Sequence, residues 1–83
     1  MHITFKLYAT LTDYLPERTD KHSIQLDIPE STTPNQLIDR FNVPRAMAHL
    51  VLLNGIYMHP SERDSANLKN GDILAIWPPV AGG

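Results

Sequence analysis

The residues of this sequence best suited to chemistry stand at its end, in the run Pro78-Pro79-Val80-Ala81-Gly82-Gly83. Two prolines restrict the backbone, and the side chains then shrink to two glycines, which adopt almost any backbone conformation. Fully extended, six residues reach about 20 Å. We expect this flexible tail, residues 78–83, to present the carboxylate of Gly83, which is ionised at neutral pH because its reference pKa is about 3.5. A carboxylate is a poor electrophile, so it must first be activated, typically as an acyl-adenylate, before sulfide or an amine attacks it.

Other reactive groups are scarce in the sequence. There are no cysteines, so thiolate nucleophiles and disulfides are excluded and any sulfur must be brought from outside. We predict no metal site and no bound cofactor, because metal ligation needs a convergent cluster. The histidines instead fall on different predicted elements with no close pair: His2, His22, His49 and His59.

Length and charge narrow the class of protein further. The 83 residues fit a single domain, 1–83, with one modest core and no room for a deep enzyme pocket. A formal net charge of -2 argues against a nucleic-acid-binding protein, which needs a basic face. Residues 1–6 lack the pattern of a signal peptide, and no apolar segment approaches membrane-spanning length. We therefore expect a soluble, cytoplasmic protein with neither a nucleic acid nor a membrane as partner.

Hydrophobic periodicity predicts two early strands and one main helix. Apolar residues alternate over 2–8 and 23–28, which is typical of half-buried strands, and their spacing over 11–15 suggests a short helical turn between them. Thr33 stands at an N-cap position with Pro34 next and Gln36 three residues on, a pattern that starts a helix. The apolar stripe of this helix consists of Leu37, Ile38 and Phe41.

The second half of the sequence predicts further strands. Two Asn-Gly pairs, Asn54-Gly55 and Asn70-Gly71, are strong tight-turn signals. The first joins an apolar run at 49–53 to a short strand at 56–58, and the second precedes a last strand at 73–77. Residues 46–48 suggest another helical turn, and residues 60–67 form a polar, turn-rich loop. This order of elements predicts an α+β fold of two layers, a mixed sheet on a helix.

Two features of these strands bear on partner binding. The run Leu50 to Leu53 is apolar on both faces, which indicates either a partner-facing patch or a central strand covered on both sides. Trp77 points outward if Leu74 and Ile76 point to the core. We interpret it as a docking residue beside the tail, against the alternative that it covers the edge of its own core.

Residues 68–83 resemble the C-terminus of the MoaD/ThiS family of ubiquitin-like sulfur carriers. The shared features are a Gly-Asp turn, an apolar strand, an aromatic residue, Pro-Pro-Val, a small residue and Gly-Gly. The similarity is greatest to the small subunit of molybdopterin synthase. It implies the β-grasp (ubiquitin-like) fold, a mixed sheet of about four to five strands packed on one main helix, in agreement with the order of elements.

The resemblance also implies a reaction cycle. A ubiquitin-activating-like adenylyltransferase would use ATP to adenylate Gly83, and a sulfur donor would convert the adenylate to a thiocarboxylate. The tail, ending in Gly82 and Gly83, would then enter the large subunit of molybdopterin synthase. This chain would be a sulfur-donating subunit with no active site of its own. Its partner-binding residues would be Trp77, Pro78, Pro79, Val80 and Ala81.

Three alternatives remain open from the sequence. A sulfur carrier for thiamin thiazole synthesis would use the same carboxylate with another acceptor, although such carriers tend to lack the Pro-Pro step. A protein modifier would be joined through Gly83 to lysines of other proteins. A non-reactive β-grasp interaction module would carry the tail incidentally.

Overall fold

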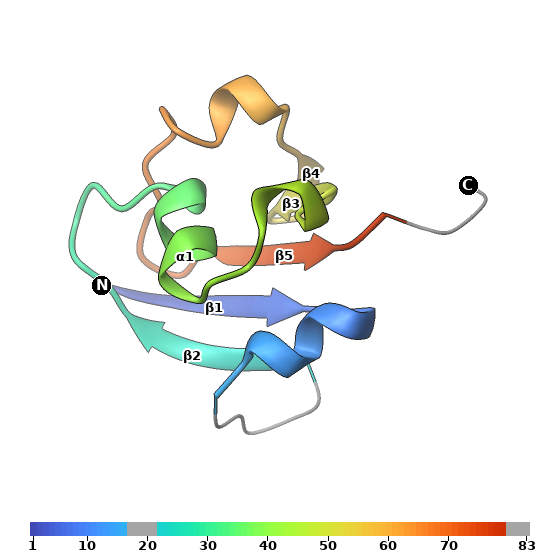
Figure 1. The fold of residues 1–83 in the computed structure, drawn as a ribbon. Coiled ribbons are helices and arrows are strands. Elements are labelled where there is room, and N and C mark those ends of the chain that lie inside the picture. Colours follow the sequence, from blue (N-terminus) through green and yellow to red (C-terminus); the bar gives the residue numbers. More distant parts are fainter. Residues whose placement is uncertain (17–21, 80–83) are drawn as a thin grey trace.

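A computed structural model describes residues 1–16 and 22–79, in which a mixed sheet packs against one α-helix (Figure 1). The strand order is β2-β1-β5-β3-β4. Strands β1 and β5 are parallel, and the other neighbours are antiparallel. The predicted α+β fold is thus confirmed. The helices and strands are β1 (His2–Leu7), η1 (Ala9–Tyr14), β2 (Ser23–Asp27), α1 (Pro34–Arg40), η2 (Arg45–Met47), β3 (Leu50–Leu53), β4 (Ile56–Tyr57), η3 (Pro60–Glu62) and β5 (Ile73–Trp77), where η denotes a 3-10 helix.

Strand β1 organises the sheet because it lies between β2 and β5. Its alternate residues are fully buried, and Phe5 is paired with Ile24 on one side and with Leu74 on the other. The parallel register of β1 and β5 matches Leu7 with Ile76, so both strands end at the same margin of the sheet. This places Tyr8, which follows β1, next to Trp77 at the end of β5.

The capping box predicted for the helix is present at the start of α1. The Gln36 backbone N–H donates to the Thr33 hydroxyl at 3.3 Å, and the Gln36 side-chain oxygen accepts from the Thr33 backbone N–H at 2.9 Å. These two bonds satisfy donors that every helix start leaves without partners. The predicted stripe then faces the core: Leu37 and Ile38 are buried, and the ring centroid of Phe41 lies 5.0 Å from that of Phe5.

Both predicted Asn-Gly turns are present, and side chains join them. Asn54 and Gly55 have φ angles of 52° and 82°, the left-handed pair that a tight hairpin turn requires. The Asn54 side chain donates to Asp72 at 2.9 Å and accepts from the Ile73 N–H at 2.8 Å. The β3–β4 hairpin is therefore attached to the point where β5 begins.

The structure decides between the two interpretations of the apolar run in β3. This strand lies between β5 and β4, and Val51 is completely buried in the core. Leu50, in contrast, is 37% exposed opposite Trp77, and Leu52 is partly exposed opposite Ala75. The strand is internal, and in the part of the chain that the structure describes its outer face is a partly exposed apolar surface.

Three short segments extend or correct the sequence prediction. The predicted helical turns at 11–15 and 46–48 correspond to the 3-10 helices η1 and η2, each displaced by one or two residues. The segment 60–67, predicted as a polar loop, instead begins with η3 and contains the buried Arg63. Within the described ranges, no helix is long and apolar enough to cross a membrane.

Candidate functional site at the base of the tail

Trp77, the last residue of β5, anchors the region from which the tail departs. Leu74 and Ile76 are fully buried, so the alternation of β5 places Trp77 on the outer face, as predicted. Its ring stacks on that of Tyr8 with the centroids 4.3 Å apart and the planes 1° apart. His22 stacks on Tyr8 at 4.8 Å. Side chains next to β1, β2 and β5 thus form one aromatic column.

Hydrogen bonds hold the backbone at the end of β5 from both sides. The Tyr8 N–H donates to the Ile76 carbonyl at 3.1 Å, and the His49 N–H donates to the Trp77 carbonyl at 3.1 Å. Proline has no N–H, so pairing of the strand stops at the next residue. Pro78 is buried and Pro79 is exposed. The sheet therefore fixes the backbone up to Trp77, and Pro79 is the last residue that the structure describes.

An apolar surface adjoins this point of departure. Alternate residues of β3 and β5 lie there side by side with Tyr8, and we call the group the outer apolar face: Tyr8, Leu50, Leu52, Ile73 and Trp77. Ile73 is 42% exposed, and the others are exposed or partly exposed. Contiguous apolar groups on a surface are typical of sites that bind other proteins.

The predicted reactive residues themselves, Gly82 and Gly83, lie outside the described residues, as do the predicted partner-binding residues Val80 and Ala81. What the structure supplies is the base of the tail: Trp77, Pro78 and Pro79. Roles for these three residues in partner binding stay predictions.

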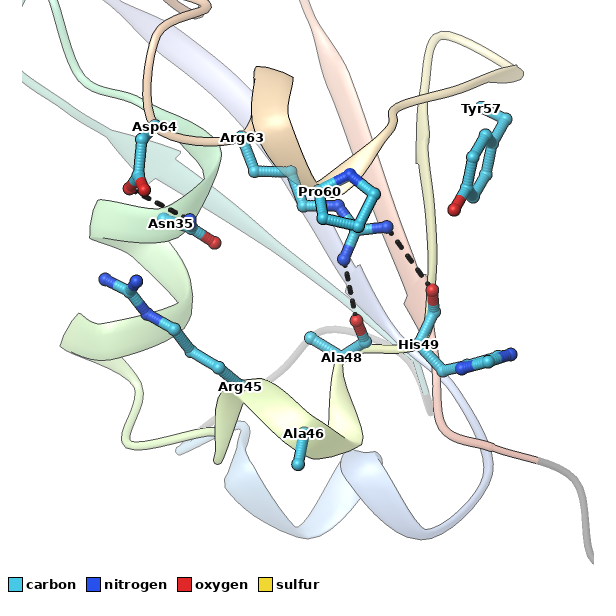
Figure 2. Close-up of a pocket in the computed structure, with 9 residues that line it drawn as sticks. All are labelled: Asn35, Arg45, Ala46, Ala48, His49, Tyr57, Pro60, Arg63 and Asp64. Atoms are coloured by element: carbon cyan, nitrogen blue, oxygen red, sulfur yellow. Dashed lines mark hydrogen bonds between the residues drawn. The ribbon is translucent and has the colours of Figure 1, made fainter.

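Sequence reasoning missed one residue that supports this site. Arg63 is only 7% exposed, and its guanidinium donates four hydrogen bonds to backbone carbonyls. The acceptors are Ala48 at 2.9 Å, His49 at 3.3 Å, and Met58 at 2.9 and 3.2 Å; Figure 2 shows the first two. Arg63 thus fastens the segments before β3 and after β4, including His49, whose N–H holds Trp77. The polar residues around Arg63 in the sequence do not show whether its side chain is buried or exposed to solvent.

A cavity of about 430 Å³ lies over Arg63 (Figure 2). Three polar side chains of its wall have partners within the fold: Asn35 donates to Asp64 at 2.9 Å, and the buried Arg63 donates to carbonyls. Among residues 1–16 and 22–79, no three His, Asp or Glu side chains gather where they could hold a metal ion. Asn35, Asp64 and Arg63 therefore have structural roles at this cavity.

Comparison with known proteins agrees with this geometry. The family model of ThiS matches residues 8–83, from Tyr8 of the aromatic column to the end of the tail. The chain belongs to the ThiS family. The protein is therefore a member of a family of ubiquitin-like sulfur carriers, as the resemblance in its last sixteen residues (68–83) implied. Comparison with curated proteins gave no match.

Solved structures support the fold of this ThiS-family chain. Those similar to it include SAMP1 from Haloferax volcanii (24% identity, TM-score 0.67) and the thiamine biosynthesis protein ThiS from Geobacter metallireducens (22% identity, TM-score 0.66). A third is the complex of subunits 1 and 2 of the molybdopterin-converting factor from Helicobacter pylori (15% identity, TM-score 0.60). Each comparison covers 100% of both chains. The β-grasp fold is thereby confirmed.

The Tyr8–Trp77 stack can be tested by fluorescence because Trp77 is the single tryptophan. We expect Tyr8→Ala to shift the emission to longer wavelength and to cost about 1 kcal/mol, since it removes an aromatic pair. Tyr8→Phe keeps a ring in place and should preserve the spectrum. Coinciding spectra of Tyr8→Ala and the parent chain would refute the stack.

Replacing Arg63 tests whether it braces the segments around β3 and β4. We expect Arg63→Met to lower the free energy of unfolding by about 3 kcal/mol, because buried carbonyls lose their donors. Urea titration followed by circular dichroism measures this loss. Arg45→Met is the matched control: its partner Asp39 lies 2.7 Å away on the surface, and screened surface pairs contribute little. Equal losses in the two variants would show that Arg63 has no special role.

Proposed function

We propose that this chain is the sulfur carrier of molybdopterin synthesis, the small subunit of molybdopterin synthase, and that it acts through a thiocarboxylate on Gly83. The observation that carries the proposal is its membership of the ThiS family together with its ending, Trp-Pro-Pro-Val-Ala-Gly-Gly. The Pro-Pro step in this ending distinguishes the expected molybdopterin carriers from the thiamin carriers.

The proposed chemistry needs two steps at the Gly83 carboxyl group, the first at an oxygen and the second at the carbon. In the first, a Gly83 carboxylate oxygen attacks the α-phosphorus of ATP, forming an acyl-adenylate and releasing pyrophosphate. In the second, hydrosulfide or an equivalent donor attacks the acyl carbon. The bond to AMP breaks, AMP leaves with the original oxygen, and the thiocarboxylate remains. Adenylation is required because the free carboxylate is a poor acceptor for any nucleophile.

The folded body contributes position and recognition to this chemistry. The bonds from Tyr8 and His49 hold the end of β5, so a partner that docks on the outer apolar face meets the tail at a fixed origin. Beyond Pro79, the small residues of the tail allow the backbone to enter a narrow channel. In this proposal, the activating enzyme and the large subunit of molybdopterin synthase supply the catalytic groups and bind the same surface in turn.

One further candidate function rests on a specific observation. The family model that matches residues 8–83 is that of ThiS, a name that a solved thiamine biosynthesis protein of the same fold also carries. A carrier for thiamin thiazole synthesis would be loaded with sulfur in the same way and would differ only in its acceptor.

The loading step is tested by intact-mass measurement. After incubation with a ubiquitin-activating-like enzyme, ATP and a sulfur donor, we expect the mass to rise by the replacement of one oxygen by one sulfur. A chain extended by one alanine after Gly83 should not be loaded, because the reactive carbon is then displaced. Asn67→Ala, an exposed change away from the tail, should load normally. Loading of the extended chain would contradict the proposal.

The acceptor is tested with the loaded carrier. Sulfur should pass to the precursor pterin when the large subunit of molybdopterin synthase is supplied. Transfer with thiazole synthase instead would favour the thiamin pathway. Lysine-linked Gly-Gly remnants on cellular proteins would favour a protein modifier, and function that survives deletion of Gly83 would favour a non-reactive module.

A further inference from the structure

The two edges of the sheet differ in how well they are protected. Strand β4 has only two residues, and short edge strands resist pairing with another chain. Strand β2, at the opposite edge, has five residues and lies at the lower margin of the sheet in Figure 1. An edge strand of this length offers a row of backbone donors and acceptors to any extended segment.

The pattern of hydrogen bonds between β1 and β2 identifies the backbone groups of β2 that point away from β1. The Ile28 N–H donates to the Met1 carbonyl at 2.8 Å, so in β2 the even-numbered residues direct their N–H and C=O groups at β1. Gln25 and Asp27 therefore direct theirs away from the sheet. Their side chains do bond to other groups, but these backbone groups face the open edge.

A cavity of about 370 Å³ lies beside this edge, between β2 and the end of α1. Ile24 and Leu26 face it from the sheet, and Phe41 and Tyr14 are among the residues that complete its largely apolar wall. Ile24 and Phe41 are partly exposed, and Tyr14 is 38% exposed. Within residues 1–16 and 22–79, the margin between the two layers of the fold is thus open on the side where β2 is the edge strand.

One cation stands at the rim of this cavity. The Arg40 side chain is exposed, and its guanidinium carbon lies 5.8 Å from the centre of the Phe41 ring. Among the described residues, no carboxylate forms an ion pair with it. The site therefore combines an open strand edge, an apolar hollow and a positive charge.

We propose that β2 and this cavity bind an extended peptide segment of another protein, which adds to the sheet as a strand and carries a flanking acidic residue. The added backbone would pair with Gln25 and Asp27. Because side chains alternate along a strand, two apolar residues spaced two apart would then enter the cavity beside Ile24 and Leu26. The acidic residue would meet Arg40. This function goes beyond sulfur carriage.

A second copy of this chain fits the site less well. Pairing of β2 with β2 would bring in another Ile24 and Leu26, and Leu26 is 9% exposed because its own core holds it. Side chains held in this way cannot enter the partner's cavity, which would stay unfilled. A peptide whose side chains have no core of their own can fill it.

The proposed site is separate from the base of the tail. Ile24 and Leu26 lie on the core side of the sheet at the β2 edge, whereas the outer apolar face lies on the other side, over β3 and β5. A peptide on β2 therefore leaves the outer apolar face uncovered, so we expect one molecule to hold the peptide while its tail is engaged elsewhere.

The test uses a fluorescein-labelled peptide, Glu-Glu-Ile-Thr-Val-Thr-Glu-Glu, titrated against the whole chain by fluorescence anisotropy. We expect saturable binding and, in hydrogen exchange, new protection of the Gln25 and Asp27 amides. The Ile24 and Leu26 amides already bond to β1 and should change little. Absence of binding, or protection at β4 instead, would overturn the proposal. Protection that grows with protein concentration without peptide would identify a second copy as the occupant and would also overturn it.

Matched variants sharpen this test. Gln25→Pro removes the edge-facing N–H and should weaken binding about tenfold, whereas Gln25→Ala keeps the N–H and should bind normally. A peptide N-methylated on alternate amides tests the same bond without altering the protein.

The charge at the rim is tested separately. Arg40→Glu should weaken binding about two- to fivefold, and a peptide with lysine flanks should restore it. Equal binding across the whole series would overturn the proposal. Because the sites are separate, Gln25→Pro should still be loaded with sulfur, so the two proposals can fail independently.

Discussion

The parallel pairing of β1 with β5 is the constraint on which the rest of the structure depends. It joins the first strand of the chain to the last one, matching Phe5 with Leu74 and Leu7 with Ile76. The two strands end together, so Tyr8 is brought against Trp77 without any long connection. The position of Trp77 is thereby a consequence of the core, since a one-residue shift of β5 along β1 would turn Leu74 and Ile76 to the outer face.

Arg63 stabilises the β3–β4 hairpin, which lies on the other side of β5. Strand β3 is short, and the hairpin that it forms with β4 has only two paired positions, which gives little stability by itself. The four bonds from Arg63 hold the ends of this hairpin, and the Asn54 side chain holds its tip to Asp72 and Ile73. The Arg63 guanidinium and the Asn54 side-chain amide thus supply hydrogen bonds in place of the backbone bonds that longer strands would form.

The parts of the fold that could be predicted from sequence are those with local causes. The capping box at Thr33, the alternation in β1 and the Asn54-Gly55 turn each act over a few residues, and the structure has all three. Arg63 could not be predicted, because its acceptors are carbonyls that only the folded chain brings together. For the same reason the sequence left open which face of β3 is covered, since the answer depends on the strands beside it. The reactive end could be proposed only from the pattern of the whole ending, and the stack beneath it required the parallel register.

The distribution of open surfaces follows from covering the sheet with a single short helix. Helix α1 has seven residues and covers the core from the inner side, and among the residues that the structure describes no second layer covers the outer face over β3 and β5. The same helix ends at Arg40 and leaves Ile24 at the β2 edge partly exposed. A larger domain would cover both places with further elements. In the two proposals made above, these exposed areas serve as separate contact surfaces for different partners.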